Sequence, residues 1–258
     1  MSIQVKKHVP SGTIILKRPE KRNAISRQMI VDLMQALDDF HQEKHVRAII
    51  ITGAGDAFSA GSDLGEIDLS RSEPDAMMQW HDDAIAYRDL LERMLLFPKP
   101  IIAAINGPAL ASGAGIAMAA DITVASEKAT FGFPEARRGL VAGIVAPLLV
   151  FRIGASHASR LLLTGLPVDA HVAHQMGAFQ EVVDSELVWA RAQELALEVA
   201  KCAPESIQLT KRMLTETIGE HLGGLLSVGA AATATARTTE AAQEGIAAFL
   251  AKREPKWP

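Results

Sequence analysis

Residues 99–121 read Lys99-Pro-Ile-Ile-Ala-Ala-Ile-Asn-Gly-Pro-Ala-Leu-Ala-Ser-Gly-Ala-Gly-Ile-Ala-Met-Ala-Ala-Asp121. The branched apolar run 101–105 has the length of a buried strand, and residues 106–108 end it before small residues begin a helix. A helix start carries unsatisfied N–H donors and a partial positive charge. Because the side chains of residues 111–115 are small, these donors are accessible. The stretch therefore predicts a place where negative charge is held or develops.

A second loop has the same character. After a predicted strand at 46–52 comes Gly53-Ala-Gly-Asp-Ala-Phe-Ser-Ala-Gly-Ser-Asp-Leu64, which is again rich in small residues that permit close backbone approach. Two such loops, each following a strand, indicate one site built from two segments.

Together the two loops resemble those of the enoyl-CoA hydratase/isomerase (crotonase) family. The resemblance covers nearly the whole chain, because the first loop and the C-terminal signature of the family also have counterparts. The motifs that carry it are Arg18-Pro-Glu-Lys-Arg-Asn-Ala24, Phe58-Ser-Ala-Gly-Ser-Asp-Leu64, residues 105–115, Ala120-Asp121, Phe131-Gly-Phe-Pro-Glu135 and residues 244–257.

The resemblance implies an α/β fold of the ClpP/crotonase type, a spiral of strand-strand-helix units with a helical C-terminal extension. We expect residues 1–185 to form the core with the acyl-CoA site, because the composition shifts near residue 185. Residues 186–258 are then the extension, which the resemblance implies is used in trimerisation and in completing the CoA site. The implied assembly is a homotrimer or a dimer of trimers.

The composition indicates a soluble globular protein. A chain of 258 residues with 48% hydrophobic and 22% charged residues buries one sizeable core. Its net charge of −4 gives no general attraction to nucleic acid or to anionic membranes. No apolar run reaches a membrane span, and residues 1–7 lack an apolar signal core. Cys202 is the single cysteine, so no intrachain disulfide forms and we expect a cytoplasmic location.

Strand and helix signals alternate along the first two thirds of the chain, which predicts a layered α/β core. Residues 64–74 lack periodicity, and we expect a mobile surface connection there. Ser26 and Ser156 are expected to cap helices. The expected strands are 3–8, 12–17, 46–52, 101–105, 179–183 and a pair at 121–125 and 130–133. The expected helices are 26–41, 75–97, 112–120, 143–151, 156–163, 186–202, 204–217, 230–236 and 239–252.

The two glycine-rich loops suit the chemistry of a thioester. An acyl thioester becomes acidic at C2 when two preorganised backbone N–H groups stabilise the charge that moves onto its carbonyl oxygen. By resemblance these donors are the N–H groups of Ser62 and Ser112. The alternative interpretation is that both loops are only tight turns that pack a strand on a helix.

Glu135 is the carboxylate that the resemblance identifies as the acid or base. Partial burial raises the pKa of a glutamate towards neutrality, where it exchanges protons with carbon. The alternative interpretation is a solvated glutamate that pairs with Arg137 or Arg138.

Position 115 departs from the hydratase pattern. Hydratases of this family carry a second glutamate there, and this chain has Gly115. A single carboxylate favours proton shuttling between C2 and C4, as in Δ3,Δ2-enoyl-CoA isomerases, whereas the hydratase label is the commoner one in the family. A third interpretation is a relative that binds acyl-CoA without turning it over.

The CoA arm is placed by resemblance alone. Backbone groups of Ala24, Ala60, Asp63 and Leu64 would line its path, and Lys252 would reach the phosphates. CoA enters as part of the substrate, and no metal or redox cofactor is implied. The alternatives are that Lys252 belongs to a solvated helix end and that Asp63 caps a short helix.

Three other sites receive little support. The pairs His171/His174 and His41/His45 have helical spacing for a metal but no third ligand of a recognised pattern. Ser59, Ser62 and Ser112 lack a Gly-x-Ser-x-Gly elbow, so a serine hydrolase has no support. Gly113-Ala-Gly115 resembles a dinucleotide fingerprint, but Met118 occupies the third small position. Residues 64–88 and 140–151 are expected to shape the acyl pocket, although no pattern in them identifies the acyl group.

Overall fold

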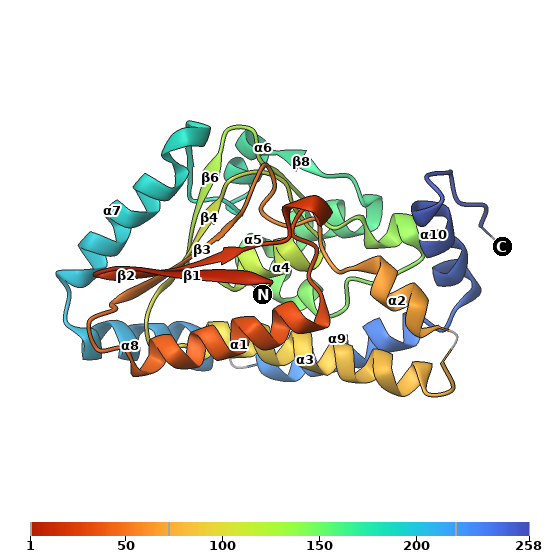
Figure 1. The fold of residues 1–258 in the computed structure, drawn as a ribbon, viewed down its shortest axis with the longest axis horizontal. Coiled ribbons are helices and arrows are strands. Elements are labelled where there is room, and N and C mark those ends of the chain that lie inside the picture. The colour runs from red at the N-terminus through yellow and green to blue at the C-terminus, as the bar shows by residue number, and fades with distance from the viewer. Residues whose placement is uncertain (1, 72, 220, 258) are drawn as a thin grey trace.

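The computed structural model describes residues 2–71, 73–219 and 221–257. Its strands are β1 Ile3–His8, β2 Ser11–Leu16, β3 Ala48–Gly53, β4 Ile101–Ile105, β5 Ala109–Leu110, β6 Ile122–Ser126, β7 Thr130–Gly132, β8 Val168–Asp169 and β9 Glu181–Val183. Six of them form one sheet in the order β1-β2-β3-β4-β6-β9, in which β1 and β2 are antiparallel and the other neighbours are parallel (Figure 1). The second sheet has the order β5-β7-β8.

Helices surround the larger sheet (Figure 1). The α-helices of the described chain are α1 Arg27–Gln42, α2 Leu64–Ser70, α3 Ala76–Leu96, α4 Ser112–Ala119, α5 Val145–Thr164, α6 Ala170–Gln175, α7 Val188–Ala200, α8 Pro204–Arg212, α9 Leu222–Ala236 and α10 Glu240–Leu250. The 3-10 turns are η1 Pro19–Lys21, η2 Pro134–Arg138 and η3 Ser185–Leu187, and η4 Met213–Ile218 is a π-helix. None of the described helices has the combined length and apolar character to cross a membrane.

The two central strands are buried on both faces, which explains their continuous apolar sequence. Successive side chains of a strand point to opposite faces. In β3, Ile49 and Ile51 join the main core, whereas Ile50 faces α7 on the other side of the sheet. The same alternation holds in β4, where Ile101 joins the main core and Ile102 faces α7. The expected α/β layers are confirmed.

α1 begins at the position predicted from the sequence. The Ser26 hydroxyl accepts a hydrogen bond from the Met29 N–H at 3.2 Å and so satisfies one free donor of the first turn. Leu33, Leu37 and Phe40 follow at helical spacing and are buried in the main core.

The expectation of a mobile connection at residues 64–74 is wrong. α2 occupies residues 64–70, and the Asp63 carboxylate caps it by accepting from the Gly65 N–H at 3.1 Å. Seven residues make fewer than two full turns, which is too short for an apolar period to show in the sequence. Ser72, which was part of the same expectation, lies outside the described residues.

The two helices expected at 143–151 and 156–163 are confirmed as the two segments of α5, which are separated by a break at Gly154 with non-helical φ 78° and ψ 160°. Ser156 follows this break by two residues, but its hydroxyl makes no capping hydrogen bond within the described part of the chain. The strands expected as a pair at 121–125 and 130–133 belong to different sheets. The short elements β5, β8 and α6 were not expected.

The chain beyond residue 185 covers two parts of the molecule. α7 packs against the outer face of the larger sheet, and α9 packs against α3 and α5. α10 lies against α2 and η2, at the end of the molecule where the C-terminus emerges (Figure 1). The helical extension thus contacts the segments that carry the predicted site.

A buried ion pair ties this extension to the sheet. Lys211 of α8 is 7% exposed, and its Nζ donates to Asp121 Oδ2 at 2.7 Å and to the Met94 carbonyl at 3.0 Å. The same Asp121 oxygen accepts from the Ile101 N–H at the start of β4. Removing the lysine leaves a largely desolvated carboxylate without its counter-charge.

We expect Lys211→Ala to lower the free energy of unfolding by about 3 kcal/mol, because one partner of a buried pair is lost. The matched control is Lys201→Ala, which removes the exposed pair of Lys201 with Glu198 and should cost below about 0.5 kcal/mol. Urea unfolding of both variants measures the difference. Equal losses in the two variants would contradict the anchoring role of Lys211.

Candidate active site

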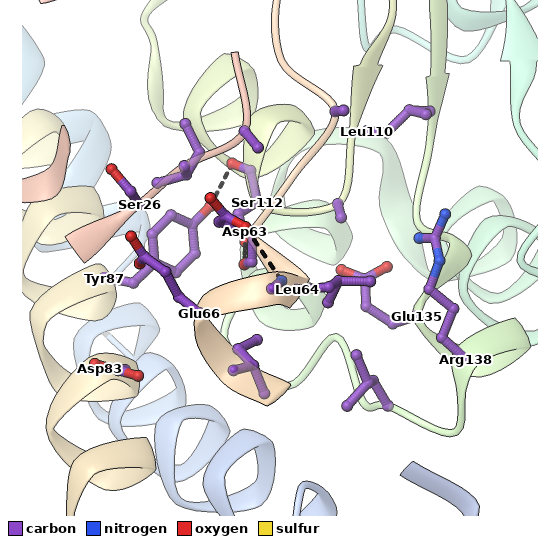
Figure 2. Close-up of a pocket in the computed structure, with 18 of the residues that line it drawn as sticks. Ser26, Asp63, Leu64, Glu66, Asp83, Tyr87, Leu110, Ser112, Glu135 and Arg138 are labelled. Atoms are coloured by element: carbon purple, nitrogen blue, oxygen red, sulfur yellow. Dashed lines mark hydrogen bonds between the residues drawn. The ribbon is translucent and has the colours of Figure 1, made fainter. Parts of the chain in front are cut away.

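A cavity of about 710 Å³ lies between the two glycine-rich loops, α3, η2 and the C-terminal helices. Such a volume suits a small-molecule ligand that is largely enclosed. Figure 2 shows part of its wall, with Glu135 and Arg138 on one side of Leu64 and Tyr87 on the other. All eight residues predicted from the sequence line it: Ala24, Ala60, Ser62, Asp63, Leu64, Ser112, Glu135 and Lys252.

Buried Asn23 joins the N-terminal loop to the first glycine-rich loop. Its side-chain amide donates to the carbonyls of Ala54 and Ala57, both at 2.8 Å. Its own carbonyl accepts from the Ser59 hydroxyl at 2.8 Å. The residue has φ 54°, a left-handed conformation that asparagine tolerates better than most residues. These bonds fix the backbone that leads to the predicted donors.

The two glycine-rich loops meet at Gly61 and Ala111. Gly61 has φ +99°, and a Cβ there would lie 2.6 Å from the Cβ of Ala111. Ala111 itself has φ 50° and ψ −124°, a strained backbone for a residue with a side chain. Beside this contact the Ser62 and Ser112 hydroxyls are hydrogen-bonded at 2.6 Å. The predicted partners, which are 50 residues apart in the chain, are therefore brought together.

The backbone N–H groups of both serines are available to a ligand. The Ile25 N–H donates to the Gly61 carbonyl and the Asp63 N–H donates to the Ile25 carbonyl. These bonds hold the chain on either side of Ser62, whose own N–H has no backbone acceptor within the described residues. Ser112 is the first residue of α4, so its N–H has no intrahelical acceptor. The arrangement is able to hold an oxygen that carries negative charge.

Glu135 is the buried acid of the cavity. η2 carries it, and its Oε2 is buried without a hydrogen-bond partner among the described residues. Burial raises the pKa of Glu135 to about 7, against smaller opposing effects of its own backbone N–H and of Arg138. A carboxyl group with this pKa both accepts and releases a proton near neutral pH.

The alternative interpretation, a solvated Glu135 paired with a neighbouring arginine, is contradicted. The Arg137 guanidinium turns away and donates through Nε to the Thr164 carbonyl at 2.9 Å. The Arg138 guanidinium stacks over the ring of Phe249, 4.4 Å from its centre. Arg138 still lines the cavity, and its positive charge faces Glu135 at longer range.

Position 115 has no room for a second carboxylate. A Cβ on Gly115 would lie 2.2 Å from the hydroxyl oxygen of Tyr87 and 2.5 Å from Cγ1 of Val145. The Tyr87 hydroxyl donates to the Ser112 carbonyl at 2.6 Å. Burial, with the charge of Glu135, raises the pKa of Tyr87 well above its usual value, so a neutral phenol stands beside this glycine.

Asp63 is engaged by three donors within the protein. Besides capping α2, its carboxylate accepts from Arg18 Nη2 at 2.8 Å and from Lys21 Nζ at 3.0 Å. Burial acts to raise the pKa of Asp63, but these two cations outweigh it and lower the pKa. The alternative interpretation of Asp63 as a helix cap therefore describes its side chain. Its backbone is also engaged, because its N–H donates to the Ile25 carbonyl and its carbonyl accepts from the Glu66 N–H.

The other predicted CoA contacts differ in whether their polar groups are already hydrogen-bonded within the protein. The Ala60 N–H donates to the Arg22 carbonyl at 2.9 Å, and the Ala24 carbonyl accepts from Arg18 at 2.7 Å. Lys252 is exposed just after α10 and lines the cavity. Its ammonium group is thus accessible to an anion, although a solvated helix end would look the same.

Several residues of the cavity were not predicted from the sequence. Tyr87 lies in the region 64–88 that was expected to shape the acyl pocket, but nothing in its local sequence marked it. Arg27, Asp83 and Arg237 come from three different helices or their ends and also line the cavity. These three residues are recognised only from the folded structure, in which they line one cavity. Within the described residues no cluster of histidine, cysteine and carboxylate side chains is suited to a metal ion.

Comparisons with known proteins agree with this architecture. A family model described as enoyl-CoA hydratase/isomerase matches residues 11–258. A Thermus thermophilus protein named "Putative enoyl-CoA hydratase" is 40% identical over 99% of this chain and 100% of its own length. A 2,3-dehydroadipyl-CoA hydratase of Escherichia coli is 33% identical over 94% of this chain and 92% of its own. The crystal structure of an enoyl-CoA hydratase/isomerase from Xanthobacter autotrophicus Py2 gives a TM-score of 0.90 at 28% identity, covering 100% and 99% of the two chains.

We expect Glu135→Gln to make the protein more stable above neutral pH. Because folding raises the pKa of Glu135 from 4.5 to about 7, the folded state holds its proton more tightly, and the free energy of unfolding falls as pH rises through this window. The glutamine side chain does not ionise, so its variant has no such loss. The free energy of unfolding of Glu135→Gln should exceed that of the wild type by roughly 3 kcal/mol at about pH 8 and by little below about pH 5.

Thermal unfolding across this pH range measures the effect. The control is Glu186→Gln, which makes the same change at an exposed position on η3 and should leave the pH dependence of unfolding as it is in the wild type. A stability difference between wild type and Glu135→Gln that does not change with pH would contradict the raised pKa.

Proposed function

The chain belongs to the enoyl-CoA hydratase/isomerase family, of the crotonase fold, and we propose that it moves a proton on an unsaturated acyl-CoA thioester with Glu135 as its single acid/base. One observation carries the proposal. The buried Glu135 carboxylate, with Oε2 free of partners among the described residues, lines the same cavity as the unengaged N–H groups of Ser62 and Ser112. The cavity therefore combines a proton carrier with a place for the oxyanion.

The oxyanion is held by backbone. We place the thioester carbonyl oxygen between the N–H groups of Ser62 and Ser112, where the start of α4 adds a partial positive charge. Loss of a proton from C2 then gives an enolate whose charge rests mainly on that oxygen. Because hydrogen bonds already fix both loops, these donors need little reorganisation as the charge forms.

Double-bond migration is the reaction that one carboxylate accomplishes unaided. Ionised Glu135 takes a proton from C2 of a 3-enoyl-CoA, and the resulting dienolate takes the same proton back at C4. The product is the conjugated 2-enoyl-CoA, with no gain or loss of atoms. The absence of space for a carboxylate at Gly115 supports this reaction, as does the neutral phenol of Tyr87 beside it.

Hydration is the second candidate, because two relatives are named hydratases. Here protonated Glu135 would give its proton to C2 of a 2-enoyl-CoA while the oxygen of water adds to C3, and the proton lost by that water would return to the Glu135 carboxylate. The Tyr87 hydroxyl, which already donates to the Ser112 carbonyl, has lone pairs left to accept a hydrogen bond from that water. A binding protein without activity is less well supported, because a buried ionisable carboxyl without a partner is costly to keep.

The rest of the proposal follows from the substrate. CoA arrives as part of the thioester, with Ala24, Ala60, Asp63 and Leu64 contributing backbone along its path and Lys252 facing its phosphates. Neither reaction moves electrons to an acceptor, so the chemistry calls for no redox cofactor. A homotrimer or a dimer of trimers in the cytoplasm is the setting that we propose for it.

We expect the purified protein to convert a 3-enoyl-CoA to a 2-enoyl-CoA, and Glu135→Gln to lower kcat at least about a hundredfold, as for loss of a general acid/base. Ultraviolet absorbance of the conjugated thioester follows the reaction, and a parallel assay on a 2-enoyl-CoA detects added water. Glu127→Gln, at an exposed position between β6 and β7, is the matched control outside the cavity. Full activity of Glu135→Gln in either assay would refute the assignment of Glu135.

The two candidate reactions predict opposite pH dependence. Isomerisation needs ionised Glu135, so kcat/KM should rise about tenfold per pH unit below about 7 and then level off. Hydration needs the protonated form, so kcat/KM should fall above about 7 instead. Rate profiles on both substrates distinguish the two cases, and a profile that is flat around neutrality would contradict both.

A further inference from the structure

A charged cluster lies at one end of the cavity, away from Glu135. Arg27 at the start of α1, Asp83 on α3 and Arg237 at the end of α9 all line the wall. Asp83 and Tyr87 are four residues apart on α3, so they share one helix face about 6 Å apart along the axis. Figure 2 shows both on the side of Leu64 opposite Glu135. The cluster is therefore one helical turn beyond the hydroxyl that contacts Ser112.

The charge of Asp83 is already matched by one arginine. Arg27 binds it through two hydrogen bonds, from Nε at 2.7 Å and from Nη2 at 2.9 Å. Gln79 donates to the same carboxylate at 2.9 Å. The hydrogen bond with Asp83 raises the pKa of Arg27, as a bidentate pair should.

Arg237 is the second cation of the cluster, and Asp83 does not bind it closely. It is 9% exposed, yet its Nη1 lies 3.5 Å from the Trp80 carbonyl and 3.7 Å from Asp83 Oδ2, both long for hydrogen bonds. Burial lowers the pKa of Arg237, and Asp83 only partly offsets this effect. Glu66, the nearby carboxylate, acts on Arg27 rather than on Arg237.

A guanidinium group has five N–H donors, and Arg237 engages only Nη1, in the two long contacts, so its other donors are available to an anion in the cavity. The lining of the cavity also includes the apolar side chains of Ile30, Ile67 and Ala84, together with Glu66 and Thr233. An acyl chain that runs from the thioester site past Tyr87 meets this guanidinium at its far end. A carboxylate there would accept two parallel hydrogen bonds from Arg237.

On the basis of the proposed function, we propose that Arg237 binds a terminal carboxylate on the acyl group, so that the substrates are acyl-CoA thioesters of short dicarboxylic acids. The methyl end of an ordinary fatty acyl chain would take water from these donors without giving them an acceptor. Arg237 is then the residue that selects the substrate, and Arg27 holds Asp83 in place beside it.

Saturated thioesters test the proposal without any turnover. We compare the binding of adipoyl-CoA with that of hexanoyl-CoA, and of glutaryl-CoA with that of pentanoyl-CoA, by calorimetry. The carboxylated member of each pair should bind at least about tenfold more tightly, which is the worth of one charge-assisted hydrogen bond. Arg237→Met should abolish this preference while leaving hexanoyl-CoA bound, and Arg237→Lys should retain part of it.

Arg160→Met, at an exposed position on α5 outside the cavity, is the control and should keep the preference. Equal binding of both members by the wild-type protein would overturn this proposal alone, even if Arg237→Met did not fold. A preference that survives in folded Arg237→Met would also overturn it, because another group would then read the carboxylate. Failure of every acyl-CoA to bind would contradict the proposed function, and this inference with it.

Discussion

The backbone of residues 60–62 lies against that of residues 110–112, and the geometry of the cavity follows from this contact. Gly61 permits it because a Cβ would collide with Ala111, and Ala111 meets it with a strained backbone. The contact brings Ser62 and Ser112 together, so that their hydroxyls are hydrogen-bonded. The Asn23 side chain fixes the first loop through its hydrogen bonds to the carbonyls of Ala54 and Ala57. Since parallel strands β3 and β4 lead into the two loops, the sheet sets the positions from which they start.

The sequence predicted what local signals encode. The apolar run of β4 and the Ser26 cap of α1 are each contained in a few consecutive residues, and the structure places both as expected. The resemblance of the loop motifs likewise identified eight residues that line one cavity. β5 was missed because two residues are too short to show a period, and α2 was anticipated only by the alternative that Asp63 caps a short helix. The break in α5 at Gly154 agrees with the sequence, which predicted separate helices on either side of it.

Other features could not be predicted because they depend on contacts between distant segments. Arg237 and Asp83 are separated by more than half of the chain, and their approach depends on the packing of α9 against α3. The surroundings of Gly115 are of the same kind, because Tyr87 and Val145 come from two other helices, α3 and α5, that pack against α4. The burial of Glu135 also follows from the assembled fold, as α10 packs against η2. In each case the residue type is visible in the sequence, and its environment is not.

The close packing of Gly115 against Tyr87 and Val145 restricts which substitutions these three positions tolerate. A glutamate at position 115 needs space that two other side chains occupy, so the substitution alone would disrupt the packing of α3 and α5 on α4. The space opens when the Tyr87 and Val145 side chains shift or are replaced by smaller ones. Each of these changes alone leaves a void, and the change at 87 also removes the phenol that binds Ser112. The three positions are therefore coupled, and their effects should not add. A change from one carboxylate to two at this site therefore involves positions 87 and 145 as well as position 115.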